Sequence, residues 1–248
     1  MISQHLSDPE QYRAESRESS RFWTVWLPVA TFIAIPICAW AAPDFFSKWF
    51  AKEDTGILEF LHFFLPLLTA LIGLRLCFSP IIRQDSFLVL WCAAMFIGGI
   101  YLSGEEASWG QHYFGWATPE GWSGINDQQE TNFHNTSNLL DQLPRAILMA
   151  GIMVTGLIYP WLLINRPGLL PKRFNFTYPP LALVPLVLVM AACWGYRGLR
   201  KTDVFREYLT YRPGEFQELF IVWFLFYYAL FLLWRERRER RERREQKS

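Results

Sequence analysis

The stretch SFLVLWCAAMFIGGIYLS, residues Ser86–Ser103, contains no charged side chain and no proline. A helix rises about 1.5 Å per residue, so roughly 18 to 20 such residues cross the hydrocarbon core of a bilayer. Backbone amides and carbonyls must be satisfied inside the chain at that depth, which leaves helices and closed barrels. The stretch is continuously apolar and does not alternate, so we interpret it as a transmembrane helix.

Outward from this stretch, five further apolar runs have comparable length. We therefore predict an all-α fold, a polytopic membrane helix bundle of about six spans with a large outer loop that contains short interfacial helices. The predicted spans are residues 22–43, 57–78, 86–103, 146–165, 174–196 and 216–234, and the outer loop covers 104–145.

Composition agrees with a membrane protein, since 52% of the 248 residues are hydrophobic and 17% are aromatic. Residues 1–21 are polar and lack the apolar core of a signal peptide, so the first span is expected to be retained. Residues 235–248 form a basic tail, which we expect to extend the last span as a helix and to contact anionic headgroups. The four cysteines fall inside spans and are interpreted as packing residues.

Basic residues near the ends of spans favour the cytoplasmic side. The side that would carry both termini holds the larger basic set, so both termini are expected in the cytoplasm. A second basic group between Arg197 and Arg212 on the opposite side argues against this, and a re-entrant fifth span would reverse the C-terminus.

This topology gathers ionisable groups at the outer ends of the spans. Charges at membrane depth are costly and usually face a cavity or a partner, so this region is the expected functional region. It contains Glu59, His62, Glu105, Glu106, Arg145, Glu215 and Glu218.

The outer loop is the most unusual segment, because forty residues exceed what a plain connection between two helices needs. It is rich in acids, amides and tryptophans and has no lysine or arginine before Arg145. Thr118-Pro119-Glu120 is typical of a helix start, which indicates a short helix at the interface.

Two strings in this loop, Gly104-Glu-Glu-Ala-Ser-Trp-Gly-Gln111 and Glu130-Thr-Asn-Phe-His-Asn135, resemble segments of uncharacterised bacterial multi-pass inner-membrane proteins. The resemblance covers residues 104–135 and departs from the expected pattern at His112, where we expect arginine. It implies a bacterial inner-membrane location and no particular activity.

Three chemistries remain open for this region. Acid–base catalysis would use Glu105, Glu106 and His134, because nearby carboxylates tune a histidine. Ligand binding would use aromatic, amide and charged groups of the loop, namely Trp109, Gln111, His112, Glu130, Asn132, Asn135 and Arg145. No metal site is expected, although Glu59, His62 and Glu218 form a weak alternative, since Glu-x-x-His supplies metal ligands in helix bundles.

The leading hypothesis is a membrane protein that binds a lipid headgroup or a glycan-like ligand at the outer face, with catalysis left open. The alternatives are a scaffold or assembly subunit of a membrane complex, and a metal-dependent membrane enzyme or transporter. Expected partners are membrane lipid, a lipid-linked or glycan ligand and a membrane protein, with no nucleic acid; no cofactor is indicated. We also expect Glu105, Glu106 and His134 to line one pocket, and the loop 104–143 to touch the loop 196–213.

Overall fold

The computed structural model describes residues 9–52, 56–124, 126, 130–133, 136–200 and 213–246. Every regular element in these ranges is helical, and six helical stretches are long and apolar enough to cross a membrane. The predicted all-α, six-span class is therefore confirmed. The spans run over Phe22–Ala41, Ile57–Cys77, Ser86–Glu106, Gln142–Asn165, Leu181–Leu199 and Gly214–Glu245.

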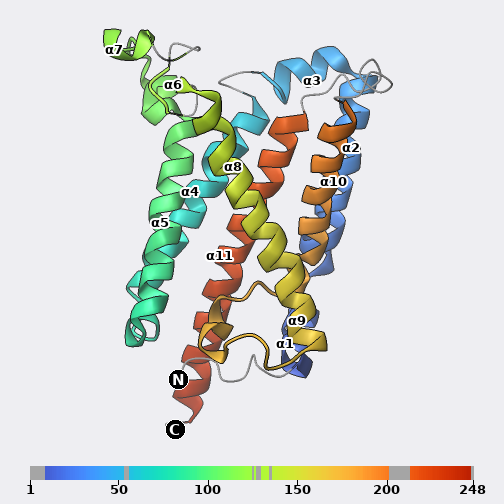
Figure 1. Cartoon of the computed structure of the whole chain (residues 1–248), viewed down its shortest axis with the longest axis vertical. Coiled ribbons are helices and arrows are strands. Elements are labelled where there is room, and N and C mark those ends of the chain that lie inside the picture. The colour runs from blue at the N-terminus through green and yellow to red at the C-terminus, as the bar shows by residue number, and fades with distance from the viewer. Residues whose placement is uncertain are drawn as a thin grey trace.

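The helices of the bundle are α2 (Leu27–Ala41), α4 (Ile57–Cys77), α5 (Ser86–Glu106), α8 (Asn138–Met153), α9 (Tyr159–Asn165), α10 (Val184–Arg200) and α11 (Pro213–Glu245). Shorter helices lie at the two ends of the bundle: α1 (Pro9–Glu18), α3 (Pro43–Trp49), α6 (Gln111–Phe114) and α7 (Glu120–Ser123). Figure 1 shows α1 and the last turns of α11 at one end, called the terminal end here, and α6 and α7 at the other, called the loop end.

Proline accounts for the later start of the fifth span and for an irregular turn inside the fourth. The fifth span begins at Leu181 and not at Phe174, because residues Lys172–Thr177 form a 3-10 segment that Pro179 and Pro180 separate from the span. The fourth span contains a π-helical turn, Val154–Ile158, directly before Pro160, whose nitrogen cannot donate the usual helical hydrogen bond.

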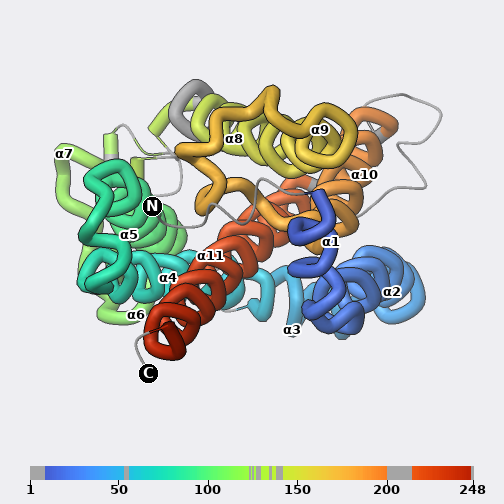
Figure 2. The backbone as a smooth tube through the Cα atoms, turned by 90° about the horizontal axis from the view of Figure 1, so that it is seen from below, coloured from blue at the N-terminus to red at the C-terminus, as the bar shows by residue number. Residues whose placement is uncertain are grey.

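Helix α11 lies at the centre of the bundle, between the α4–α5 pair on one side and α10 on the other (Figure 2). It is the most buried span, with 67% of its apolar window inside the protein, whereas the other spans bury 17% to 39%. Large apolar side chains such as Trp40, Leu90 and Ile97 remain 82%, 69% and 65% exposed. Such surfaces are stable in lipid, which agrees with a membrane-spanning bundle.

Glycines allow α4 and α5 to approach closely. A Cβ atom added to Gly99 of α5 would lie 2.6 Å from the carbonyl oxygen of Pro66 in α4, and one added to Gly73 would lie 2.9 Å from the carbonyl oxygen of Cys92. Small residues at helix crossings are the usual means of close packing in membranes. The pair fixes the position of Glu106 at the loop end relative to the side chains of α4.

Helix α11 continues unbroken to Glu245, as the sequence predicts for the basic tail. The first two charged residues of the basic tail are nevertheless part of the protein interior, since Arg235 is 5% and Glu236 0% exposed. Glu236 accepts a hydrogen bond from Ser79 Oγ at 2.6 Å and pairs with Arg240. The start of the tail therefore packs against the loop between α4 and α5.

Candidate functional site

The chain reverses direction at the loop end immediately after α5. Ser108, Trp109 and Gly110 have φ angles of 44°, 55° and 108°, which places three successive residues on the left-handed side. A side chain in this conformation costs about 1 kcal/mol or more, so Ser108 and Trp109 need compensating contacts. The polar network described next provides those contacts.

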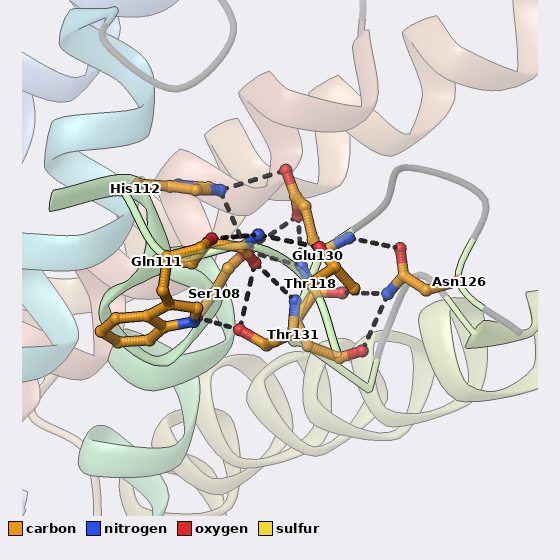
Figure 3. A network of polar contacts seen from close by, with 9 residues as sticks. Ser108, Gln111, His112, Thr118, Asn126, Glu130 and Thr131 are labelled. Carbon is orange, nitrogen blue, oxygen red and sulfur yellow. Dashed lines mark hydrogen bonds and ion pairs between the residues drawn. The ribbon is translucent and has the colours of Figure 1, made fainter. Parts of the chain in front are cut away.

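Ser108 lies at the centre of a buried network, called the loop network here, whose main members are Ser108, His112, Glu130 and Asn132 (Figure 3). The Ser108 hydroxyl is 0% exposed, donates to Glu130 Oε2 at 2.8 Å and accepts from Asn132 Nδ2 at 3.0 Å. His112 Nε2 lies 2.9 Å from Ser108 Oγ and 3.0 Å from Glu130 Oε1. The network therefore joins the turn after α5 to the chain segment that returns from α7.

Amide side chains extend the loop network on both sides. Asn126 Nδ2 donates to the Asn132 side chain at 2.9 Å, and its oxygen accepts from the Glu130 backbone N–H at 3.1 Å. Gln111 accepts from the backbone N–H of Thr131 at 2.8 Å and donates to Thr118 Oγ1 at 2.9 Å (Figure 3). These bonds fix the two loop segments relative to each other without β-sheet pairing.

The hydrogen-bond roles within the loop network do not match those of a serine-nucleophile relay. The Ser108 hydroxyl donates its single proton to Glu130. Because an ionised carboxylate can only accept, His112 Nε2 carries a proton and donates it to Glu130 and to Ser108 Oγ. A general base needs a free lone pair facing the hydroxyl, and in a triad the carboxylate contacts the opposite ring nitrogen. The arrangement instead holds the loop in shape.

The carboxylate of Glu130 is tuned by the same contacts. Burial alone would raise the pKa of Glu130, but hydrogen bonds from His112, Ser108 and Asn132 outweigh it and hold this pKa below its usual value. Glu130 is thus favoured in its ionised form, as an acceptor of several hydrogen bonds.

The carboxylate of Glu105 is also hydrogen-bonded within the protein. Its two carboxylate oxygens accept hydrogen bonds from Trp109 Nε1 and from the backbone N–H of Phe133, both at 2.7 Å. Glu105 is only 3% exposed, and it connects the end of α5 to the returning loop. These two hydrogen bonds stabilise the carboxylate charge, which the sequence analysis identified as costly at membrane depth.

Below the loop network, a cavity of about 450 Å³ lies between α4, α5, α8 and α11. Its walls are mostly apolar and aromatic, with Met95, Gly98, Leu148, Val222 and Leu225 among the lining residues. Its charged groups gather where the spans reach the loop end. Those groups are His62, Glu105, Glu106, Arg145 and Glu218.

One ion pair and one histidine–carboxylate contact define this polar end of the cavity. Arg145 Nη1 of α8 lies 2.8 Å from Glu218 Oε1 of α11. His62 Nδ1 of α4 lies 3.8 Å from Glu106 Oε2 of α5, and its Nε2 lies 3.0 Å from the backbone carbonyl oxygen of Glu215. Four different helices therefore contribute to one polar surface, and each of the four side chains contacts a partner on another helix.

The structure divides the residues singled out in the sequence into two groups. Trp109, Gln111, His112, Glu130 and Asn132 belong to the loop and its network, where they contact each other, Glu105 or Thr131. Glu106 and Arg145 line the cavity instead. Glu105 belongs to both groups, because it accepts hydrogen bonds from the loop and also lines the cavity.

Other expectations fall outside the described residues. His134 and Asn135 lie there, so the pocket predicted for Glu105, Glu106 and His134 stays a prediction. Residues 201–212 lie there as well, so the predicted contact between the two loops also stays a prediction.

Sequence reasoning missed the deeper lining of the cavity. Trp91 Nε1 of α5 donates to the Tyr228 hydroxyl of α11 at 2.9 Å, and both side chains line the cavity. Nothing local marks these residues, because they lie inside apolar runs and their contact spans 137 positions.

The chain matches no protein-family model, no curated protein and no solved structure.

Proposed function

We propose that this membrane protein binds an amphipathic ligand, a lipid or a lipid-linked glycan, in the cavity between α4, α5, α8 and α11. The observation that carries the proposal is the polarity of that cavity, which has an apolar body at membrane depth and charged groups only toward the loop end. Acyl chains match the apolar walls, and a headgroup would meet Glu106, His62 and Arg145. Binding sites of this kind combine an apolar lining with a few polar groups that fix orientation.

The charges at the polar end favour a particular class of headgroup. Three carboxylates, those of Glu105, Glu106 and Glu218, line the cavity together with one arginine, Arg145. Hydrogen-bond donors such as amine or sugar hydroxyl groups complement such a surface, whereas a lone phosphate would meet like charge. We therefore infer an amine-bearing or hydroxyl-rich headgroup.

The orientation and location complete the proposal. The terminal end carries α1 with Arg13 and Arg17 and the arginine-rich last turns of α11, which supports a cytoplasmic terminal end and an outer loop end by the positive-inside rule. The resemblance of residues 104–111 and 130–135 to bacterial proteins supports the inner membrane as the location. The headgroup would then come from the outer leaflet.

The test is ligand retention by the purified full-length protein. Native mass spectrometry in a mild detergent would compare three probe lipids of matched acyl chains: phosphatidylethanolamine, diglucosyl diacylglycerol and phosphatidylglycerol. We expect wild-type protein to retain the first two in preference to the anionic third. Glu106→Gln should shift the preference toward the anionic lipid.

Two glycines give a matched pair of variants. Gly98 lines the cavity and has no neighbouring atom within 4 Å of an added Cβ, so Gly98→Phe should fill the cavity and abolish retention. Gly151 of α8 is equally open but is exposed and is not among the lining residues, so Gly151→Phe should retain lipid as wild type does. Leu225→Phe fills the cavity from α11 and serves if Gly98→Phe does not fold. Unchanged retention in a folded cavity-filling variant would refute the proposal.

A further inference from the structure

Three potential metal ligands from two helices converge beside the cavity. Glu59 and His62 lie three residues apart on α4 and so share a face, and Glu106 is the last residue of α5. One donor atom from each of the three lies within 4.8 Å of the other two. The sequence suggested Glu218 as the third member, but its carboxylate lies against Arg145, and Glu106 takes that place.

The hydrogen bond on the far side of His62 determines which nitrogen faces this cluster as an acceptor. A backbone carbonyl can only accept, so the contact between His62 Nε2 and the Glu215 carbonyl oxygen requires the proton on Nε2. In a neutral imidazole, Nδ1 then presents a lone pair, and it does so 3.8 Å from a carboxylate oxygen of Glu106. A lone pair and an ionised carboxylate repel each other unless a proton or a metal ion lies between them.

The imidazole is too buried to be satisfied by bulk water, since His62 is 2% exposed. Among the described residues, its polar contacts are the Glu215 carbonyl on Nε2 and the Glu106 carboxylate beside Nδ1. The 3.8 Å separation exceeds a hydrogen bond, yet it suits two ligands that each lie about 2.0–2.2 Å from one shared metal ion. A histidine that ligates a metal typically donates its other N–H to a carbonyl or carboxylate, as His62 does here.

We propose that Glu59, His62 and Glu106 bind one divalent transition-metal ion, with His62 Nδ1 and a carboxylate oxygen of each glutamate as ligands. Two carboxylates and one imidazole are a donor set that zinc, manganese and iron(II) accept. Because His62 and Glu106 also line the cavity, the remaining coordination positions face it. The metal site shares Glu106 and His62 with the headgroup end of the cavity, so the lipid-retention experiments above use the EDTA-treated, metal-free protein.

The experiment measures metal on the purified full-length protein after treatment with EDTA and removal of the chelator. Zinc and manganese would be offered separately, and bound metal would be counted by inductively coupled plasma mass spectrometry. We expect close to one equivalent in wild type and at least a tenfold weaker affinity in Glu59→Gln and in Glu106→Gln. Cobalt(II) offered in place of zinc should give visible absorption bands in wild type that these variants lack.

The controls separate loss of a ligand from loss of fold. Glu120→Gln changes a carboxylate of α7 at the same end of the protein and should keep the full equivalent. Thermal unfolding identifies variants that do not fold, and His62→Gln offers a third ligand change. If folded Glu106→Gln and wild type bind equal amounts of metal, or if neither binds any, the cluster is not a metal site and the proposal is wrong. Lipid retention is measured separately, so either proposal can fail alone.

Discussion

Arg235 of α11 donates hydrogen bonds from Nε and Nη2 to the two carboxylate oxygens of Glu15 in α1, 220 residues earlier in the chain. Its Nη1 also donates to the carbonyl oxygens of Phe176 and Tyr178, at 2.8 and 2.6 Å. Tyr12 adds a bond from its hydroxyl to the Pro179 carbonyl oxygen. One guanidinium thus ties α1 and the segment before α10 to the central helix at the terminal end.

We expect Arg235→Met to lower the free energy of unfolding by about 3–5 kcal/mol, because Glu15 would remain buried without its partner. Thermal unfolding in detergent measures the effect. Arg238→Met is the control on the same helix, because Arg238 and its partner Glu242 are 44% and 36% exposed and such pairs contribute about 0–1 kcal/mol. Equal stability of the two variants would show that α1 is not held by this contact.

Substitution by alanine should affect stability differently at Gly98 and Gly99, two neighbouring glycines of α5. In Gly99→Ala, the new Cβ would lie 2.6 Å from the Pro66 carbonyl oxygen, so α4 and α5 must separate, at a cost of about 1–3 kcal/mol. In Gly98→Ala, the Cβ meets nothing within 4 Å, and alanine favours a helix over glycine, so no stability should be lost. Unfolding midpoints of the two variants, measured side by side, test the α4–α5 contact.

The loop network should weaken in acid. Hydrogen bonds hold the pKa of Glu130 below its usual value in the folded protein, so its ionised form contributes stability above the unfolded pKa of about 4.5. That stability is lost as the pH falls through the folded pKa. Amide hydrogen exchange of residues 108–118, corrected for intrinsic rates, should show protection that declines below about pH 4.5 in wild type.

Glu130→Gln removes the titrating group and provides the control for this pH effect. The variant should show weaker protection of residues 108–118 at neutral pH, with a much flatter dependence on acid. If Glu130→Gln loses protection in acid as steeply as wild type, the decline has another origin.

Hydropathy was sufficient to predict the spans, because lipid imposes one requirement on length and polarity all along the chain. The sequence also predicted that charged groups gather at one end, since topology alone carries Glu106, Arg145 and Glu218 there. It did not predict partners, because those depend on how helices pack. Arg235 illustrates this: in the sequence it begins a repetitive basic stretch, and only the packing of α1 against α11 makes it an interior residue.

The same limit applies to the loop. The acids, amides and tryptophans of residues 104–133 indicated a binding surface, but Glu105, Glu130 and Asn132 are occupied by bonds within the loop. Composition cannot distinguish a polar group that faces a ligand from one that satisfies a strained turn such as Ser108–Gly110. The apolar body of the cavity, in contrast, is built from positions that carry no functional signal in the sequence.

The pair between Arg145 and Glu218 gives the last prediction. Both side chains are about one fifth exposed, at 23% and 19%, and they face a cavity that already holds Glu106. Arg145→Met leaves two carboxylates facing each other without this cation, so we expect a loss of about 1–3 kcal/mol in unfolding free energy. Glu218→Gln in the same background removes one of those carboxylates and should restore part of the loss. The double-mutant cycle, measured by unfolding in detergent, should therefore give a favourable coupling energy between the two residues. Additive effects of the two substitutions would mean that Arg145 and Glu218 act independently, and that Arg145 is available to a ligand.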